Sequence, residues 1–357
     1  MDTFVYVFSG RPDMKEIVLK SGKRIGEGSP CYIIMDVAAN HNGDLDTAKE
    51  LIRKAAEAGA DAIKLQTYRA EDMYSKKTPQ FSRDNMKPFD LIKSVQHPRE
   101  WIPQLAEYAK GFDIDFLSTP FDYDAVDLLD DTGVSLFKVA SLEIVDLRFL
   151  KYIGGKGKPV ILSTGMASLG EIEEAVDAVK SAGNDNIALL HCNTCYPSPV
   201  HIVNLKAMET LRDAFKLPTG FSDHTLGWHI PVAAVAIGAC AIEKHFTLSR
   251  KQEGPDHGFS IEPEELKLMV QHIRDIEKAM GDGVKKVSTE ELENYEKGRR
   301  SLIARVDIAK GTVITEDMVT AKRPGYGIKP RFFDMVIGRT AKVDIYEDDV
   351  LVWDMLV

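Results

Sequence analysis

The sequence has no apolar run that approaches the roughly 20 residues of a membrane-spanning helix, which argues against an integral membrane protein. The first residues, Met1 to Phe8, are apolar but few, and Asp2 stands where a signal peptide carries basic residues. We therefore expect a cytoplasmic protein that has no membrane partner.

Cationic side chains are fewer than anionic side chains. The chain has 45 Lys and Arg residues against 55 Asp and Glu residues, which gives a formal net charge of −10 at pH 7. A general nucleic-acid binder needs a basic face, so we expect no nucleic-acid partner. A small anionic ligand is not excluded, because a few lysines and arginines can gather locally within an acidic protein.

Cysteine is rare, with only 4 residues in a chain of 357. Cys192-Asn-Thr-Cys195 matches the C-x-x-C spacing, but no second pair accompanies it and no helix start of the thioredoxin type follows it. We interpret both cysteines as small core residues and assign no redox or zinc function to them.

What the sequence does contain is a regular alternation of short apolar runs and amphipathic helical patterns. This alternation is typical of βα units and a parallel sheet. The predicted strands are Tyr32–Val37, Ala62–Thr67, Asp115–Thr119, Leu136–Ala140, Val160–Ser163, Ile187–Cys192, Thr219–Ser222 and Ala241–Phe246. Eight such strands in about 250 residues predict a (β/α)8 TIM barrel. A doubly wound open sheet is the alternative, but no glycine-rich fingerprint follows the first strand.

Three regions depart from this alternation. Residues 15–30 predict a β-hairpin that covers the bottom of the barrel, and the polar insertion Tyr68–Gln96 is expected to overhang its top. Near the C-terminal end, short strands broken by turns replace the helical patterns. We therefore expect a barrel domain over residues 1–284, a linker over 285–298 and a small, mostly β domain over 299–357.

Polar side chains gather where the predicted strands end, and in a barrel these ends line the active-site mouth. Two lysines beside several hydroxyls suit a phosphate and a carboxylate. Two histidines indicate a divalent metal or an acid/base pair, and their acidic neighbours favour the metal. Such a set indicates condensation or cleavage of a phosphorylated, carboxylate-bearing substrate. It consists of Asp36, Lys64, Gln66, Thr119, Lys138, Ser141, Glu143, Ser163, His191, Asn193, Tyr196, Ser222, Asp223, His224, Glu243 and His245.

A plainer interpretation stands beside this one. Buried lysines such as Lys64 and Lys138 often belong to structural ion pairs, and a histidine at a strand end is often a hydrogen-bonded core residue. By strand alternation Lys244 should face the helix layer or solvent, so we leave it out of the candidate site.

Several ordered motifs resemble those of the sialic acid (N-acetylneuraminate) synthase family, a group of phosphoenolpyruvate-dependent nonulosonic acid synthases. The barrel motifs include Asn40-His-Asn-Gly43, Gly220-Phe-Ser-Asp-His224, Glu243-Lys-His245 and Gly254-Pro-Asp-His257. Lys322-Arg-Pro-Gly325 resembles the family's antifreeze-like (SAF) domain. The resemblance covers nearly all of the chain from residue 32 onward.

The resemblance implies a transferase that condenses phosphoenolpyruvate with an N-acylated aldose, giving a nonulosonic acid and phosphate by C–O cleavage. By motif, His224 and His245 hold Mn²⁺ or Mg²⁺, and Asp36 joins them as a catalytic residue. Arg323 acts on the sugar from the partner subunit of a domain-swapped homodimer. The same pattern assigns substrate binding to Lys64, Gln66, Thr119, Lys138, Ser141, Ser163, Asn193, Tyr196, Ser222 and Asp256.

The chain departs from the family pattern in three places. Many members carry Glu where this chain has Asp36, a side chain one methylene shorter. Where some members have Asn just before the tyrosine segment of strand six, this chain reads Asn193-Thr194, and the insertion Tyr68–Gln96 does not match clearly. Two other functions are weighed against the synthase. A Schiff-base aldolase would use Lys64 or Lys138 as its nucleophile and would need no metal. A non-catalytic sugar-binding protein would leave the barrel-mouth lysines and histidines unexplained. The sequence is compatible with N-acetylmannosamine, a diacetamido-hexose or another surface-polysaccharide precursor as the sugar.

Overall fold

The computed structural model describes residues 16–82 and 85–357. The chain divides into two compact units, Met1–Asp282 and Gly283–Val357. Residues 1–8, on which the signal-peptide argument depends, lie outside the described residues. Among the helices that the structure describes, none is both long enough and apolar enough to cross a membrane.

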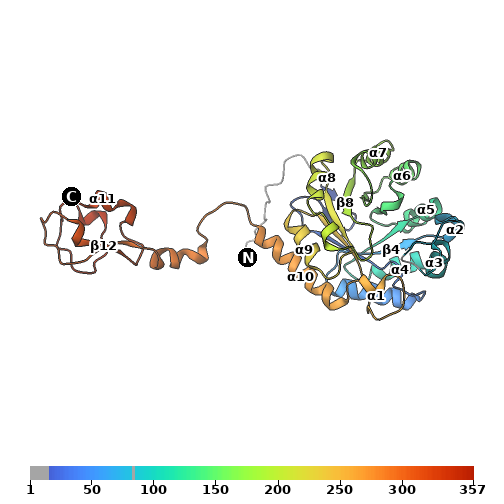
Figure 1. The fold of residues 1–357 in the computed structure, drawn as a ribbon, viewed down its shortest axis with the longest axis horizontal. Coiled ribbons are helices and arrows are strands. Elements are labelled where there is room, and N and C mark those ends of the chain that lie inside the picture. The colour runs from blue at the N-terminus through green and yellow to red at the C-terminus, as the bar shows by residue number, and fades with distance from the viewer. Residues whose placement is uncertain (1–15, 83–84) are drawn as a thin grey trace. The chain divides into compact units, whose positions relative to one another are not determined.

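The first unit is built on eight parallel strands, and the predicted (β/α)8 barrel is confirmed (Figure 1). The hydrogen-bonded order is β5-β4-β3-β10-β9-β8-β7-β6, and β5 packs against β6 to close the ring. Three strands match their predicted bounds and the other five differ by one residue at one or both ends. The strands are β3 (Tyr32–Asp36), β4 (Ala62–Thr67), β5 (Asp115–Pro120), β6 (Phe137–Val139), β7 (Val160–Ser163), β8 (Ile187–Cys192), β9 (Thr219–Asp223) and β10 (Ala241–His245).

Helices surround the ring of strands (Figure 1). In the helix that follows β7, Ile172, Val176 and Val179 are buried at the spacing that forms one apolar face. Ser168 caps its first turn by accepting from the Glu171 N–H. The helices are α1 (Leu45–Glu57), α4 (Trp101–Ala109), α5 (Tyr123–Thr132), α6 (Leu147–Gly154), α7 (Leu169–Lys180), α8 (Ala207–Phe215), α9 (His229–Ala236) and α10 (Pro263–Met280).

The N-terminal hairpin, β1 (Ile17–Val18) and β2 (Arg24–Ile25), packs against the lower part of the barrel interior. Ile17 and Ile25 join a cluster of inward apolar residues from six strands of the barrel, among them Leu117 and Leu190. Because the lower interior is apolar, the polar inward side chains are confined to the carboxyl ends of the strands.

The insertion after β4 is more regular than the sequence indicates, because it contains α2 (Ala70–Met73) and α3 (Pro88–Val95). The side chain of Gln96 accepts a hydrogen bond from the Ala70 N–H at 2.9 Å. This tertiary bond joins the two ends of the insertion, so its helices depend on a contact that local periodicity does not reveal.

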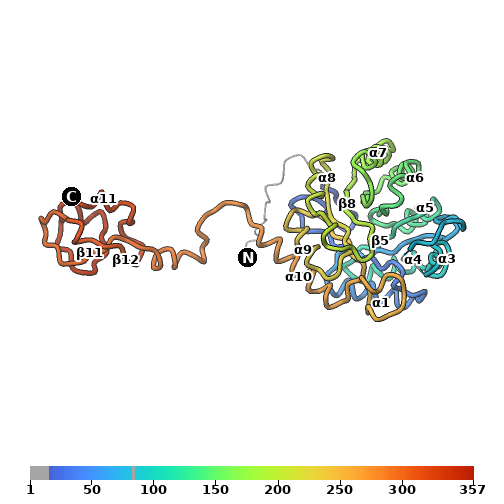
Figure 2. The backbone as a smooth tube through the Cα atoms, in the orientation of Figure 1, coloured from blue at the N-terminus to red at the C-terminus, as the bar shows by residue number. Residues whose placement is uncertain are grey.

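The second unit has little regular structure, and its backbone consists mainly of turns and short segments (Figure 2). β11 (Ser301–Ala304) pairs antiparallel with β12 (Val319–Lys322), and α11 (Phe333–Val336) follows. Single bridges such as Ile308–Ile345 add further pairing. Its own apolar core includes Leu302, Ile314, Val336 and Leu351.

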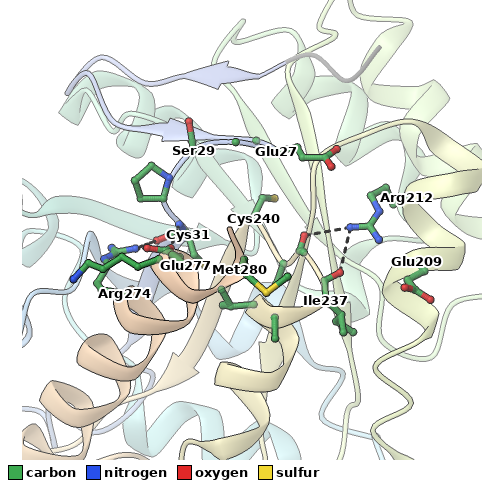
Figure 3. Close-up of a pocket in the computed structure, with 18 residues that line it drawn as sticks. Glu27, Ser29, Cys31, Glu209, Arg212, Ile237, Cys240, Arg274, Glu277 and Met280 are labelled. Atoms are coloured by element: carbon green, nitrogen blue, oxygen red, sulfur yellow. Dashed lines mark hydrogen bonds and ion pairs between the residues drawn. The ribbon is translucent and has the colours of Figure 1, made fainter. Parts of the chain in front are cut away.

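A pocket of about 730 Å³ lies at the hairpin end of the barrel (Figure 3). It is bounded by residues 26–31 and by parts of α8, α9 and α10, and the free thiols of Cys31 and Cys240 belong to its wall. None of the predicted site residues lines it. The pocket is therefore separate from the strand-end cluster described next.

Candidate active site

The inward side chains at the carboxyl ends of the strands form one buried polar cluster. Strand alternation places them there, because every second residue of each strand points into the barrel. Of the predicted site residues, the cluster includes Asp36, Lys64, Gln66, Thr119, Lys138, Ser163, Ser222, His224 and His245.

Asp36, at the end of β3, is the first centre of this cluster. Its Oδ2 accepts from Lys64 Nζ at 2.8 Å and from Gln66 Nε2 at 3.0 Å, and lies 3.7 Å from His245 Nε2. Lys64 Nζ also donates to Thr119 Oγ1 at 3.3 Å. Burial alone would raise the pKa of Asp36, but the neighbouring Lys64 ammonium lowers it to about 2. Asp36 is therefore an ionised hydrogen-bond acceptor.

Glu243, on β10, is the second centre. Its Oε1 accepts from Ser222 Oγ at 2.9 Å and lies 3.5 Å from Lys138 Nζ, while its Oε2 lies 3.6 Å from Lys64 Nζ. Lys138 Nζ donates to Ser163 Oγ at 2.6 Å. One carboxylate thus joins both lysines. Burial opposes its charged form, but the two ammonium groups lower the pKa of Glu243.

Glu243 is missing from the residues that the family resemblance assigns. Its signal in the sequence is period-two alternation, which puts Ala241, Glu243 and His245 on the same inward face of one strand. The sequence places Glu243 at the barrel mouth, but its position between two lysines follows from the packing of three strands.

His224 and His245 face each other across neighbouring strands, with ring centroids 5.3 Å apart. His224 Nδ1 donates to the Asn193 carbonyl at 2.8 Å, which leaves Nε2 as the nitrogen with a free lone pair. Burial lowers the pKa of His224 to about 4 and also lowers the pKa of His245. Tyr196 and Phe259 cover the two rings with centroid distances of 4.3 Å and 4.9 Å.

This pair suits a divalent cation as two of its ligands. The imidazoles are neutral, and the buried Nδ1 of His245 has no hydrogen-bond partner among the described residues. Within the same residues, no three His, Cys, Asp or Glu side chains come together as a metal-binding group. A metal held here would therefore need its remaining ligands from substrate and water.

Tyr68 is missing both from the strand-end set and from the residues that the resemblance assigns. It follows β4 on the same face as Lys64 and Gln66, and its side chain is buried. Burial raises its pKa, and the carboxylates of Asp256 and Asp36 raise it further, so both acids lie near the phenol. Alternation extended by two residues past Gln66 would have indicated this position.

Two predicted residues occupy the rim of the mouth. Asp256 Oδ2 accepts from the Ala39 N–H at 3.1 Å, which ties it to the loop after β3. Ser141 Oγ accepts from the Gly165 N–H at 3.0 Å and so joins the loops after β6 and β7.

Two others lie elsewhere. The side chain of Asn193 donates to the Ile202 carbonyl at 3.0 Å and lines a separate pocket beside α7 and α8. Asn193 contributes to the mouth through its own carbonyl, which holds His224. Arg323 belongs to the second unit, where its Nε donates to the Gly298 carbonyl at 2.7 Å.

Comparison with known proteins identifies relatives along most of the chain. The NeuB family model matches residues 51–285, and the SAF domain model matches residues 299–357. An N,N'-diacetyllegionaminic acid synthase of Campylobacter jejuni is 46% identical over 89% of this chain and 98% of that protein. A protein of the same name from Legionella pneumophila is 40% identical over 92% and 95%.

Solved structures include a similar protein. The crystal structure of N-acetylneuraminic acid (sialic acid) synthetase from Leptospira borgpetersenii, in complex with citrate, superposes with a TM-score of 0.71 at 37% identity. The match covers 79% of this chain and 95% of that one. By the family model, the identity and the extent of these matches, the chain belongs to the NeuB family and carries a SAF domain at its C-terminal end.

Proposed function

We propose that this protein condenses phosphoenolpyruvate with an N-acylated aldose, in a reaction that depends on a divalent metal, and releases phosphate by C–O cleavage. The observation that carries the proposal is the arrangement of two buried lysines around Glu243 beside two neutral imidazoles. The names of the relatives support the same class of reaction.

The lysines supply the anion site of this proposal. Lys64 and Lys138 would bind the phosphate and carboxylate of phosphoenolpyruvate, helped by the hydroxyls of Thr119, Ser163 and Ser222. Both ammonium groups are already held in place, so the site needs little reorganisation when the substrate enters.

The histidines supply the metal site. His224 and His245 would hold Mn²⁺ or Mg²⁺, and the bound ion would polarise the aldehyde carbonyl of the open-chain sugar. C3 of phosphoenolpyruvate then attacks the aldehyde carbon, and water adds to the electron-poor C2. Asp36 Oδ2, which Lys64 keeps ionised, would accept a hydrogen bond from that water. The C2–O bond to phosphate then breaks.

The aldose that this proposal favours is a diacetamido-hexose, because two of the similar relatives are N,N'-diacetyllegionaminic acid synthases. Gln66, Tyr68, Tyr196 and Asp256 would contact the sugar from the barrel. We also propose that Arg323 contacts it from the partner subunit of a domain-swapped homodimer.

Phosphate release from phosphoenolpyruvate, measured against a panel of N-acyl aldoses with and without Mn²⁺, tests the proposal. We expect release only with both an aldose and the metal, and the fastest release with a diacetamido-hexose. His224→Ala and His245→Ala should each abolish turnover, whereas His201→Ala, at an exposed position, should not. Normal activity of either site variant would refute the metal assignment.

The Schiff-base aldolase has one specific observation in its favour, since burial lowers the pKa of Lys138. That function predicts that borohydride traps a covalent adduct with pyruvate and that activity survives EDTA. The synthase proposal predicts the reverse of both outcomes, so a single set of assays separates the two functions.

A further inference from the structure

Two loops meet above the seam between β3 and β10. The β3 loop is residues 37–44 and the β10 loop is residues 246–262, and their strands pair in register as far as Asp36 and His245. Asp256 lies on the β10 loop, close to the mouth. The contacts that hold the β3 loop and the β10 loop together therefore also fix the position of Asp256.

The first link between the loops is Asn40, a residue that is 1% exposed. Its Nδ2 donates to the Phe246 carbonyl and to Ser260 Oγ, both at 2.9 Å. Ser260 Oγ in turn donates to the carbonyl of Asp256 at 2.6 Å. Asn40 thus connects the β3 loop to both ends of the β10 loop.

The second link is His257, a residue that is also 1% exposed. Its Nε2 lies 3.1 Å from Asn42 Oδ1, and its Nδ1 lies 2.7 Å from Thr247 Oγ1. An amide oxygen only accepts, so Nε2 carries the proton that Asn42 Oδ1 accepts, while Nδ1 pairs with the Thr247 hydroxyl. The ring therefore uses both nitrogens, one toward each loop.

Gly254 completes this arrangement. Its φ is +153°, and a Cβ there would lie 2.7 Å from His257 Cδ2 and 3.2 Å from Asn42 Oδ1. A side chain at this position would push the ring away from Asn42. The backbone of the β10 loop is packed directly against the link that His257 makes.

We propose that His257 is a positioning residue for the aldose. It locks the β10 loop onto the β3 loop and thereby holds the Asp256 carboxylate, its neighbour in the chain, at the mouth of the barrel. The role of Asp256 toward the aldose rests on the proposed function. The link that His257 makes between the two loops, which we call the lock, does not rest on the proposed function, because it depends only on contacts within the chain.

Kinetics of three variants test the proposal. His257→Ala should raise the KM for the aldose about tenfold, the effect of losing one or two hydrogen bonds, and leave the KM for phosphoenolpyruvate within about twofold. His257→Gln keeps a donor for Asn42 and should recover most of the loss. His201→Gln, the matched change at an exposed histidine, should alter neither constant. Equal increases in both KM values for His257→Ala would overturn the inference.

Hydrogen exchange of the substrate-free protein gives a readout that is independent of the reaction. In His257→Ala and Gly254→Ala, the amides of the β3 and β10 loops should exchange about tenfold faster or more, while those of α7 keep their rate. Unchanged exchange in both variants would refute the lock. If exchange accelerates but the native protein releases no phosphate with any aldose, the lock stands and the proposed function is wrong.

Discussion

At the scale of single residues, the mouth of the barrel is a set of buried charges that compensate one another. Asp36 and Glu243 share Lys64, and Glu243 also pairs with Lys138. These ammonium groups lower the pKa values of both carboxyls despite their burial. Glu143 is different. Its Oε2 is buried without a hydrogen-bond partner among the described residues, and burial raises its pKa to about 7.

The raised pKa of Glu143 predicts a pH-dependent stability. Between the ordinary value of 4.5 and about 7, the unfolded chain releases the proton while the folded chain keeps it. The free energy of unfolding should therefore fall as pH rises, by up to about 3 kcal/mol from pH near 4.5 to about 8. Glu143→Gln cannot ionise and should lack this component. Parallel pH slopes in urea titrations of the two proteins would contradict the prediction.

Tyr68 provides a second residue-scale prediction. Its buried phenol lies near the carboxylates of Asp256 and Asp36. If the hydroxyl contacts the aldose, Tyr68→Phe should raise the aldose KM about tenfold and spare the KM for phosphoenolpyruvate. Tyr123→Phe, at an exposed tyrosine, is the matched control. Identical aldose KM values in both variants would remove Tyr68 from the site.

At the scale of elements, the outer faces of β9 and β10 are joined by a buried ion pair. Lys244 Nζ lies 2.5 Å from Asp223 Oδ2 and donates to the Thr225 carbonyl at 2.6 Å. Alternation placed Lys244 on the side of the helix layer or solvent, and in the structure it is buried. Asp223 directly precedes His224, and Lys244 directly precedes His245. The ion pair therefore helps to set the distance between the two strands that lead to these histidines.

Removing one member of this pair should destabilise the barrel. Lys244→Met leaves the Asp223 carboxylate buried without its cation, which costs about 3–5 kcal/mol. The double variant Asp223→Asn, Lys244→Met removes both charges and should recover most of that loss. Urea unfolding measures all three proteins. A double variant as unstable as Lys244→Met would show that the lost stability comes from packing of the lysine stem.

At the scale of the whole molecule, the chain consists of two units with separate apolar cores. The barrel contains the lysines and histidines, and the second unit contains Arg323. If Arg323 contacts the aldose as proposed, the reaction needs both units.

Mixed dimers test whether Arg323 acts between subunits. When Arg323→Ala and His245→Ala proteins are unfolded and refolded together, about half of the dimers contain one of each, and one of their two sites is then intact. Action between subunits should restore about a quarter of the native phosphate release. If Arg323 acts within its own chain, every site in the mixture carries one of the two changes and phosphate release does not recover. A mixture without recovered phosphate release would therefore refute the exchange of domains.

Most of the barrel follows from local pattern. Period-two and period-3.6 apolar repeats predict the eight strands and the helices between them, because each element buries one face. The same alternation predicts that Lys64, Lys138, His224 and His245 point into the mouth. The insertion Tyr68–Gln96 was the exception, since its helices rely on the distant bond from Ala70 to Gln96.

The linear pattern says which face a side chain occupies, and this was enough for the fold class and for most of the residues at the mouth. It does not say which partners that side chain meets, because these come from strands up to about two hundred residues apart whose stagger is set when the barrel closes. The place of Glu243 between two lysines, the outward turn of Asn193 and the link from His257 to Asn42 all depend on that closure.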